Sequence, residues 1–275
     1  MAATNNRTAC RHSITARWVC MTAVLTLVAC ASSPLGRKQL ILFPESQMSE
    51  MGVAAFADIK TKTPANTDAT TDRYVQCVSD HIVRALGNGN PSDWEVEVFA
   101  ADQANAFALP GGKIGVYTGL LNVAANQDQL ATVIGHEVAH VLARHSNERV
   151  STASLAQTGL QVVQIAAGAD TPAKQQLLGL LGAGAQYGII LPFGRKQESE
   201  ADLIGLDLMA QAGFDPRESV RLWQNMAAQG GQRPPEFAST HPSSDRRIND
   251  LNNRMQRAMQ LSLAARLAGK NPDCS

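Results

Sequence analysis

The sequence predicts a mostly helical α+β fold with one small antiparallel sheet. Apolar residues recur at helical spacing through most of the chain, whereas alternation of apolar and polar residues is confined to a short region between residues 94 and 117. The chain has 275 residues, of which 44% are hydrophobic and 17% charged, a composition typical of globular rather than disordered proteins. No internal repeat or convincing second domain is evident, so residues 46–275 are expected to form one domain.

An export signal is predicted for residues 1–29. Three arginines and no acidic residue precede an apolar run at 18–29, which is too short to span a bilayer permanently. Cys30 directly follows Leu-Val-Ala, a pattern that resembles the bacterial lipobox, where the cysteine is lipidated and becomes the mature N-terminus. An ordinary secretory signal with an incidental cysteine is the alternative. We therefore expect lipidation of Cys30 and a polar, lipid-anchored tether at residues 30–45.

The residues after Cys30 bear on location and partners. By resemblance to the sorting rules of double-membraned bacteria, Ala31 and Ser32 favour the periplasmic face of the outer membrane, with membrane contact through the N-terminal lipid. The formal net charge of the whole chain is zero, and loss of residues 1–29 would leave a slightly acidic protein. Nucleic acid is therefore not expected as a partner.

Cysteine usage fits an oxidising compartment. Cys10 and Cys20 would leave with the signal, and Cys30 would carry the lipid. Cys77 and Cys274 remain as an even pair, and we expect a disulfide that joins the C-terminal tail to an early helix. Two free buried thiols are the alternative.

Helices are expected first, at residues 46–86, where apolar residues recur every four positions: Met51, Ala55 and Ile59, then Tyr74, Val78, Ile82 and Leu86. A Gly-Asn-Gly-Asn-Pro breaker ends this region. The alternating segment at 94–99 predicts a half-buried strand, and the segments at 104–109 and 113–117 flank Pro-Gly-Gly, which predicts a hairpin.

A helix is then expected to begin at a cap supplied by Asn126 or Asp128 and to run to about His145. The segment at 151–193 is rich in Ala, Gly, Leu and Gln, and its part at 177–193 has no charge. The uncharged part contains glycines and is barely long enough to span a membrane. We therefore expect a helical pair that covers the preceding helix, and not a membrane span.

Three further helices complete the prediction. One is expected at 197–211 and ends before Gly213. The next begins at Asp215 and Pro216, a cap followed by a first-turn proline. The last is long and polar and begins at Ser243 or Ser244.

The chemically informative segment is His136-Glu137-Val138-Ala139-His140. On a helix, the two histidines project from one face toward one point, and Glu137 lies close enough to reach a water there. Two imidazoles and a carboxylate base are the minimum set for zinc-activated hydrolysis. A solvated helix would have polar neighbours, but the flanking residues are apolar: Leu130, Val133, Ile134, Val138, Val141 and Leu142.

A zinc ion on two histidines needs a third protein ligand. One route would place a glycine three residues and a histidine six residues after His140, but these positions hold Ala and Ser. His145 falls one residue short and is expected at the surface.

The other route uses a glutamate on a separate helix, and the segment at 198–202 supplies it. Glu198 is expected to bind the metal, and Asp202, on the same helix face, to accept a hydrogen bond from the far nitrogen of a ligand histidine. Glu200 is the alternative ligand. An exposed acidic helix start without any metal remains the simpler reading.

These motifs resemble peptidase family M48, which includes HtpX-like and CAAX-prenyl-protease-like enzymes. The resemblance spans about 95–250 and also rests on Asn105–Gly112, Gly205, Ala212–Pro216 and Thr240-His241-Pro242. With the lipobox, it is strongest toward the periplasmic outer-membrane lipoproteins of the family. The transmembrane helices of the prenyl-protease branch are missing, so prenylated substrates are not expected.

The resemblance implies a gluzincin-type metallopeptidase domain at 46–275, with one Zn²⁺ per chain and a small antiparallel sheet beside the zinc helix. It also implies that His241 lies near the metal, where it would stabilise the transition state or bind zinc in a closed resting form. A buried structural histidine is the alternative. Arg246 is a further candidate for positive charge at the same place.

The expected function is zinc-dependent endopeptidase activity toward unfolded or misfolded envelope proteins, with Glu137 as the catalytic base. The substrate would add an extended strand near residues 105–109. The alternative is a lipoprotein chaperone or assembly factor for outer-membrane proteins, in contact with the outer-membrane assembly machinery and with a zinc-plugged, resting site.

Overall fold

The computed structural model describes residues 30–87, 89–166, 193–229, 241 and 245–274. The predicted signal peptide, and residues 167–192 of the predicted helical pair, lie outside the described residues. The described part is mostly helical with small sheets, which confirms the predicted fold class. None of its helices combines the length and the apolarity needed to cross a membrane.

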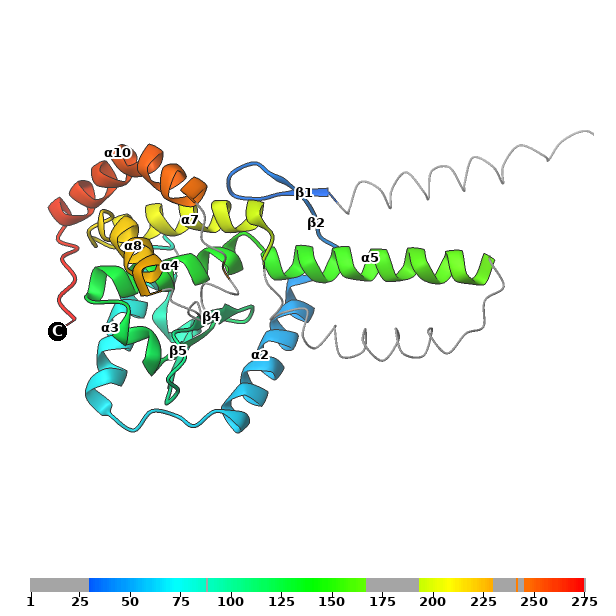
Figure 1. Cartoon of the computed structure of the whole chain (residues 1–275), viewed down its shortest axis with the longest axis horizontal. Coiled ribbons are helices and arrows are strands. Elements are labelled where there is room, and N and C mark those ends of the chain that lie inside the picture. Colours follow the sequence, from blue (N-terminus) through cyan, green and yellow to red (C-terminus); the bar gives the residue numbers. More distant parts are fainter. Residues whose placement is uncertain (1–29, 88, 167–192, 230–240, 242–244, 275) are drawn as a thin grey trace, which may run out of the picture.

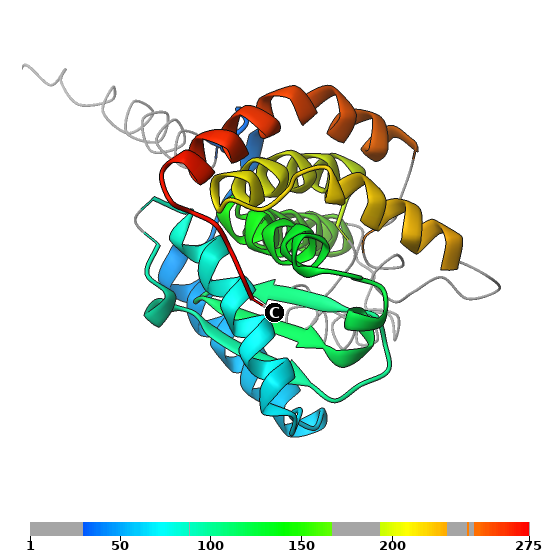
Figure 2. The ribbon, with the colours of Figure 1, turned by 90° about the vertical axis from the view of Figure 1, so that its left-hand side faces the viewer.

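From residue 45 onward, the described elements follow the expected order (Figure 1). The helices are α2 (Glu45–Lys62), α3 (Ala69–Arg84), α4 (Gln127–Leu142), α5 (His145–Ala166), α7 (Arg195–Gln211), α8 (Glu218–Gln229) and α10 (Asp245–Leu267). The strands are β1 (Cys30–Ser32), β2 (Lys38–Leu40), β3 (Glu95–Phe99), β4 (Ala106–Leu109) and β5 (Lys113–Tyr117). Figure 2 shows the layers, with α10 over α7, α7 over α4, and α4 over the three-stranded sheet.

The three-stranded sheet is mixed, which corrects the predicted antiparallel sheet. Its order is β3-β5-β4, and β4 and β5 form the expected antiparallel hairpin around Pro110 and Gly111. β3 pairs parallel to β5, because the chain leaves β3 and crosses to the far edge before the hairpin begins. β4 is therefore an edge strand.

Side-chain alternation gives the sheet two apolar faces. Ala106, Ala108, Ile114 and Val116 belong to the main core, which α3, α4 and α7 complete. On the opposite face, the rings of Phe99 and Phe107 pack on Phe56 of α2, and the ring of Tyr117 packs on both of them. Gly115 lies opposite Phe107, and a Cβ there would collide with the Phe107 ring.

Helix α4 is the centre of the fold. Asn126 caps it by accepting a hydrogen bond from the backbone N–H of Gln129, as predicted. Every residue from Gln129 to His140 is buried, because α7 covers one side and the sheet the other. The helix ends at Leu142, earlier than predicted, because Arg144 adopts a left-handed backbone (φ 53°) that turns the chain into α5.

The backbones of α4 and α7 make close contact at a pair of glycines. A Cβ on Gly205 would lie 2.8 Å from the backbone nitrogen of His136 and 2.9 Å from the carbonyl carbon of Gly135. Only hydrogen at this position lets the two helices approach so closely. The residues on either side of the crossing are consequently brought face to face.

The N-terminal segment, which was expected to be a polar, lipid-anchored tether, contains a hairpin. β1 and β2 form an antiparallel hairpin, and Ser33 and Gln39 are buried. Gln39 donates from Nε2 to the carbonyl of Ala143 (2.6 Å), and Asn147 donates to the carbonyl of Phe43 (2.8 Å). Composition indicated polar residues here but not that they bond to the start of α5. The lipidation of Cys30 stays a prediction.

Cys77 of α3 and Cys274 are joined by a disulfide, with their Cα atoms 5.6 Å apart. The C-terminal tail therefore returns from α10 to α3, and Figure 2 shows it running down past the helical layers.

Replacing Gly205 with alanine is expected to destabilise the fold. The added Cβ would force α7 away from α4, and overpacking of this kind costs about 1–3 kcal/mol in the free energy of unfolding. Urea denaturation measures this loss.

Gly194→Ala, at the N-cap of the same helix, is the control, because its Cβ would approach nothing closer than 3.7 Å. Equal unfolding midpoints for the Gly205 variant and the wild type would show that the crossing is not tight.

Candidate metal centre

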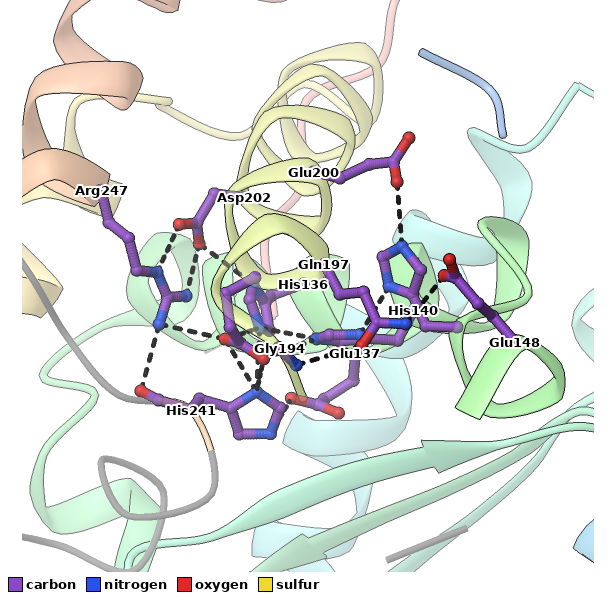
Figure 3. A network of polar contacts seen from close by, with 12 residues as sticks. His136, Glu137, His140, Glu148, Gly194, Gln197, Glu200, Asp202, His241 and Arg247 are labelled. Atoms are coloured by element: carbon purple, nitrogen blue, oxygen red, sulfur yellow. Dashed lines mark hydrogen bonds and ion pairs between the residues drawn. The ribbon is translucent and has the colours of Figure 1, made fainter. Parts of the chain in front are cut away.

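Four buried side chains converge on one point. His136 and His140 come from α4, Glu198 comes from the first turn of α7, and His241 lies between α8 and α10. One nitrogen or oxygen atom from each lies within 4.8 Å of all the others. Figure 3 shows both α4 histidines and His241 pointing into the same space.

The donor distances fit a tetrahedral zinc site. The Nε2 atoms of His136 and His140 are 3.0 Å apart, and Nδ1 of His241 lies 3.1 Å from His136 Nε2 and from Glu198 Oε1. The Glu198 oxygens lie 3.4 Å from His136 Nε2 and 3.5 Å from His140 Nε2. Ligands about 2.0–2.1 Å from a tetrahedral zinc are about 3.3 Å from one another. The residues present therefore fit this ion.

Asp202 lies behind His136, as the sequence predicted. Its Oδ1 is 3.0 Å from Nδ1 of His136, so the proton of that imidazole faces the carboxylate and the Nε2 lone pair faces the donor cluster (Figure 3). Burial raises the pKa of Asp202, but Arg247 outweighs burial and holds this pKa below its ordinary value. Asp202 is therefore an ionised acceptor.

Arg247, which the sequence analysis missed, binds several groups of the centre at once. Its Nε and Nη2 donate to Asp202 (2.5 and 2.7 Å), and its Nη1 lies 3.1 Å from Glu198 Oε2 and donates to the carbonyl of His241. The predicted Arg246 is instead 77% exposed and pairs with Asp250.

Helix periodicity could have distinguished the two arginines. Arg247 belongs to the buried stripe of α10, which continues through Leu251, Ala258, Ser262 and Ala265, and Arg246 does not.

His145 is buried, not exposed as predicted. Its Nδ1 lies 2.8 Å from Nδ1 of His140, and its Nε2 lies 3.1 Å from Oε2 of Glu200. Since Glu200 can only accept, His145 donates to it from Nε2 and accepts the Nδ1 proton of His140. The Nε2 lone pair of His140 then faces the donor cluster. Glu200 is thus neither in the donor cluster nor exposed. His145 is buried because the chain turns at Arg144, and no motif signals this turn.

Phe193 covers one ligand. Its ring stacks on the imidazole of His140, with centroids 3.7 Å apart and planes 22° apart, and the guanidinium of Arg149 lies 3.9 Å from the Phe193 centroid. Apolar cover of this kind keeps water from the side of the ligand.

The charges of the cluster are strongly coupled. Burial lowers the pKa of His136, but Asp202 and Glu198 outweigh burial and raise this pKa to about 9. Burial raises the pKa of Glu198, but hydrogen bonds from His136 and His241 bring it well below its ordinary value. Burial and the neighbouring histidines lower the pKa of His140, which is therefore neutral at pH 7.

Glu137 lies between the donor cluster and the sheet. Its Oε1 is 3.3 Å from Nε2 of His241, and the backbone N–H of Ala108 in β4 hydrogen-bonds to the carboxyl group. Burial raises the pKa of Glu137, while electrostatic interactions with His241 and His136 lower it. A carboxyl group with a raised pKa beside a metal centre can both take and return a proton.

The zinc affinity of the metal-free protein is expected to rise by up to about tenfold per pH unit and to level off above about pH 9. The reason is that His136 has its pKa raised from 6.5 to about 9, so zinc must displace its proton throughout that window. Competition with a chromophoric chelator at several pH values measures the profile.

Asp202→Asn is expected to move the levelling point to lower pH, because it removes a group that raises the pKa of His136. Asp207→Asn, on the same helix but paired with Arg254, is the control. An affinity that does not change across the window would contradict this account of the cluster.

The chain matches the model of peptidase family M48 over residues 69–255, more than half of its length. It is 40% identical over 183 residues to the mitochondrial metalloendopeptidase OMA1 of Schizosaccharomyces pombe, covering 66% of this chain and 52% of that protein. It is 42% identical over 154 residues to the protein of the same name from Arabidopsis thaliana, covering 56% and 30%. The beta-barrel assembly-enhancing protease of Yersinia pestis is 32% identical over 215 residues, covering 76% and 44%. The chain thus spans about half or less of the length of these relatives.

These relatives contradict the predicted location at the periplasmic face of a bacterial outer membrane. The metalloendopeptidases that match at 38–42% identity, from two yeasts and a plant, are named as mitochondrial proteins. The prediction rested on a short apolar run and a cysteine near the N-terminus, and such a pattern carries little information compared with a match over most of the folded domain.

The matches confirm the resemblance noted in the sequence and the prediction of a metalloprotease, and the four-residue donor cluster confirms the predicted zinc cofactor. The buried group of three histidines and a glutamate could hold a metal ion, and the family match spans all four residues. This chain therefore belongs to peptidase family M48.

Proposed function

We propose that the protein is a zinc-dependent endopeptidase that cleaves unfolded or misfolded proteins. The observation that carries this proposal is the position of Glu137, a buried carboxyl group between the donor cluster and the edge strand β4. A peptide bound along β4 would lie beside both that carboxyl group and the donor cluster.

The chemistry divides between the ion and the protein. Zinc held by His136, His140 and Glu198 would supply Lewis acidity toward a water and a peptide carbonyl. The Glu137 carboxylate would accept the proton of the attacking water and return it to the leaving amide nitrogen. Asp202 and Arg247 hold His136 and Glu198 in place during this transfer.

The edge strand supports an extended substrate. Tyr117 donates its N–H to the carbonyl of Asn105 (3.0 Å), so in the alternating antiparallel pattern Ala106 and Ala108 direct their backbone groups away from β5. The N–H of Ala108 bonds to Glu137, which places the base directly beside this edge. A segment must be free of its own structure to pair along such an edge. This requirement favours unfolded regions over folded proteins as substrates.

A second candidate function is a chaperone or assembly factor whose zinc site is plugged at rest. The position of His241 favours it, because Nδ1 of His241 lies among the donor atoms where a fourth ligand would be. Relatives named beta-barrel assembly-enhancing proteases also support a link between peptidase domains of this kind and protein assembly. Both functions are compatible if the binding of a substrate protein moves His241 away from the fourth ligand position.

Glu137→Gln is expected to keep zinc but to lower the cleavage of denatured casein by at least about 10²–10⁴-fold, because the amide cannot accept the proton. Peptide release and bound zinc are measured on the same sample. Glu218→Gln is the control, since Glu218 is a buried carboxyl group that bonds to Gln129 outside the cluster. Full activity in the zinc-loaded Glu137 variant would remove the proposed base.

His241→Ala is expected to increase cleavage, since three protein ligands remain and the fourth position opens. The increase would be roughly tenfold if one molecule in ten is open at rest. His81→Ala, a half-buried histidine that packs on Phe214 instead, is the control. Decreased cleavage at unchanged zinc content would instead assign His241 to transition-state stabilisation.

A further inference from the structure

Arg37, in the hairpin formed by β1 and β2, joins two carboxylates that lie behind the metal centre. Its Nε donates to Oε2 of Glu200 (2.8 Å) on α7. Its Nη1 and Nη2 donate to the two oxygens of Glu148 (2.5 and 2.7 Å) on α5. The hairpin precedes residues 69–255, which match the family model.

The first carboxylate leads to a metal ligand. Glu200 accepts from Nε2 of His145, and Nδ1 of His145 lies 2.8 Å from Nδ1 of His140. Arg37 therefore fixes the far end of a chain of hydrogen bonds that sets the ring orientation and tautomer of His140. The hydroxyl of Ser33, in the same hairpin, also donates to Glu200.

The second carboxylate leads to the other ligand helix. Glu148 accepts from Nε2 of Gln197 (2.8 Å), and Oε1 of Gln197 accepts from the backbone N–H of Gly194 (3.1 Å). This bond holds the first turn of α7, where Glu198 follows Gln197. Figure 3 shows Gln197 and Glu148 reaching toward each other beside His140.

The bonds of Arg37 are largely shielded from water. The side chain of Arg37 is 24% exposed, and those of Glu148 and Glu200 are 15% and 5% exposed. A two-pronged pair with a carboxylate is geometrically stricter than a single-point contact. One guanidinium thus ties the start of α5 to the start of α7 at a fixed separation.

We propose that Arg37 is a positioning residue of the zinc centre and that the N-terminal hairpin is a structural part of that centre. By joining Glu200 to Glu148, it sets the spacing between His140 and Glu198. The proposal rests on the zinc centre and not on the identity of the substrate.

The test measures metal binding rather than cleavage. Zinc is removed from the wild type, Arg37→Ala and Arg37→Lys, and zinc affinity is measured by chelator competition. The visible spectrum of the cobalt-loaded proteins reports ligand geometry. We expect Arg37→Ala to weaken zinc binding by about 10–100-fold and to change the cobalt spectrum. Arg37→Lys, which keeps one charged contact but not the fork, is expected to give an intermediate affinity.

Arg254→Ala is the matched control. Arg254 also makes a two-pronged pair with a carboxylate, that of Asp207 on α7 (3.1 and 2.6 Å), at a similar exposure. Among the residues that the structure describes, no hydrogen bond connects Asp207 to the donor cluster. Urea denaturation of the metal-free proteins compares the loss of stability. If Arg37→Ala does not fold, the affinity and spectrum of Arg37→Lys decide the question.

Wild-type zinc affinity and cobalt spectrum in the Arg37 variants would overturn the proposal, as would an equal loss of affinity in Arg254→Ala. A wild type that binds no zinc would overturn the metal centre together with this proposal. Normal zinc binding without cleavage of casein would overturn the proposed endopeptidase function alone, and the Arg37 comparison would stand.

Discussion

The close crossing of α4 and α7 at Gly135 and Gly205 is the constraint on which the rest of the structure depends. Helix α4 carries His136 and His140 and helix α7 carries Glu198, so the distance between their axes decides whether Glu198 reaches the two histidines. Side chains larger than hydrogen at the crossing would separate the helices by more than the ligands could compensate. The sheet and α10 press the two helices together from opposite sides.

Bringing this donor set together concentrates negative charge in the core. Glu137, Glu198 and Asp202 are all nearly inaccessible to water, and isolated buried charges are strongly unfavourable. Arg247 offsets this cost, because it bonds to Asp202 and lies beside Glu198 while its guanidinium also stacks 4.0 Å from the centroid of Trp223. The last helix is therefore an electrostatic part of the centre as well as a cover for α7.

The sequence predicted the part of the site that depends on local spacing. The two α4 histidines and the pair of Glu198 and Asp202 could be predicted because residues four apart share a helix face. His145 could not, since its burial depends on one left-handed residue between two helices. The hairpin around Arg37 could not either, because its contacts join residues more than 100 positions apart.

The same distinction between local and long-range information holds for the fold. Helix and strand positions followed from apolar periodicity, whereas the parallel pairing of β3 with β5 depends on where the connecting chain crosses the sheet, and periodicity contains no such information.

The disulfide determines how a backbone cut in this protein can be detected. Cys77 and Cys274 are 197 positions apart, so nearly all of the catalytic apparatus lies inside one covalent ring. A single backbone cut anywhere in that ring, including one made by a second copy of the enzyme, opens the ring without releasing a fragment. Such a nicked molecule keeps its full mass apart from one added water, and it separates into pieces only when a thiol reductant is present.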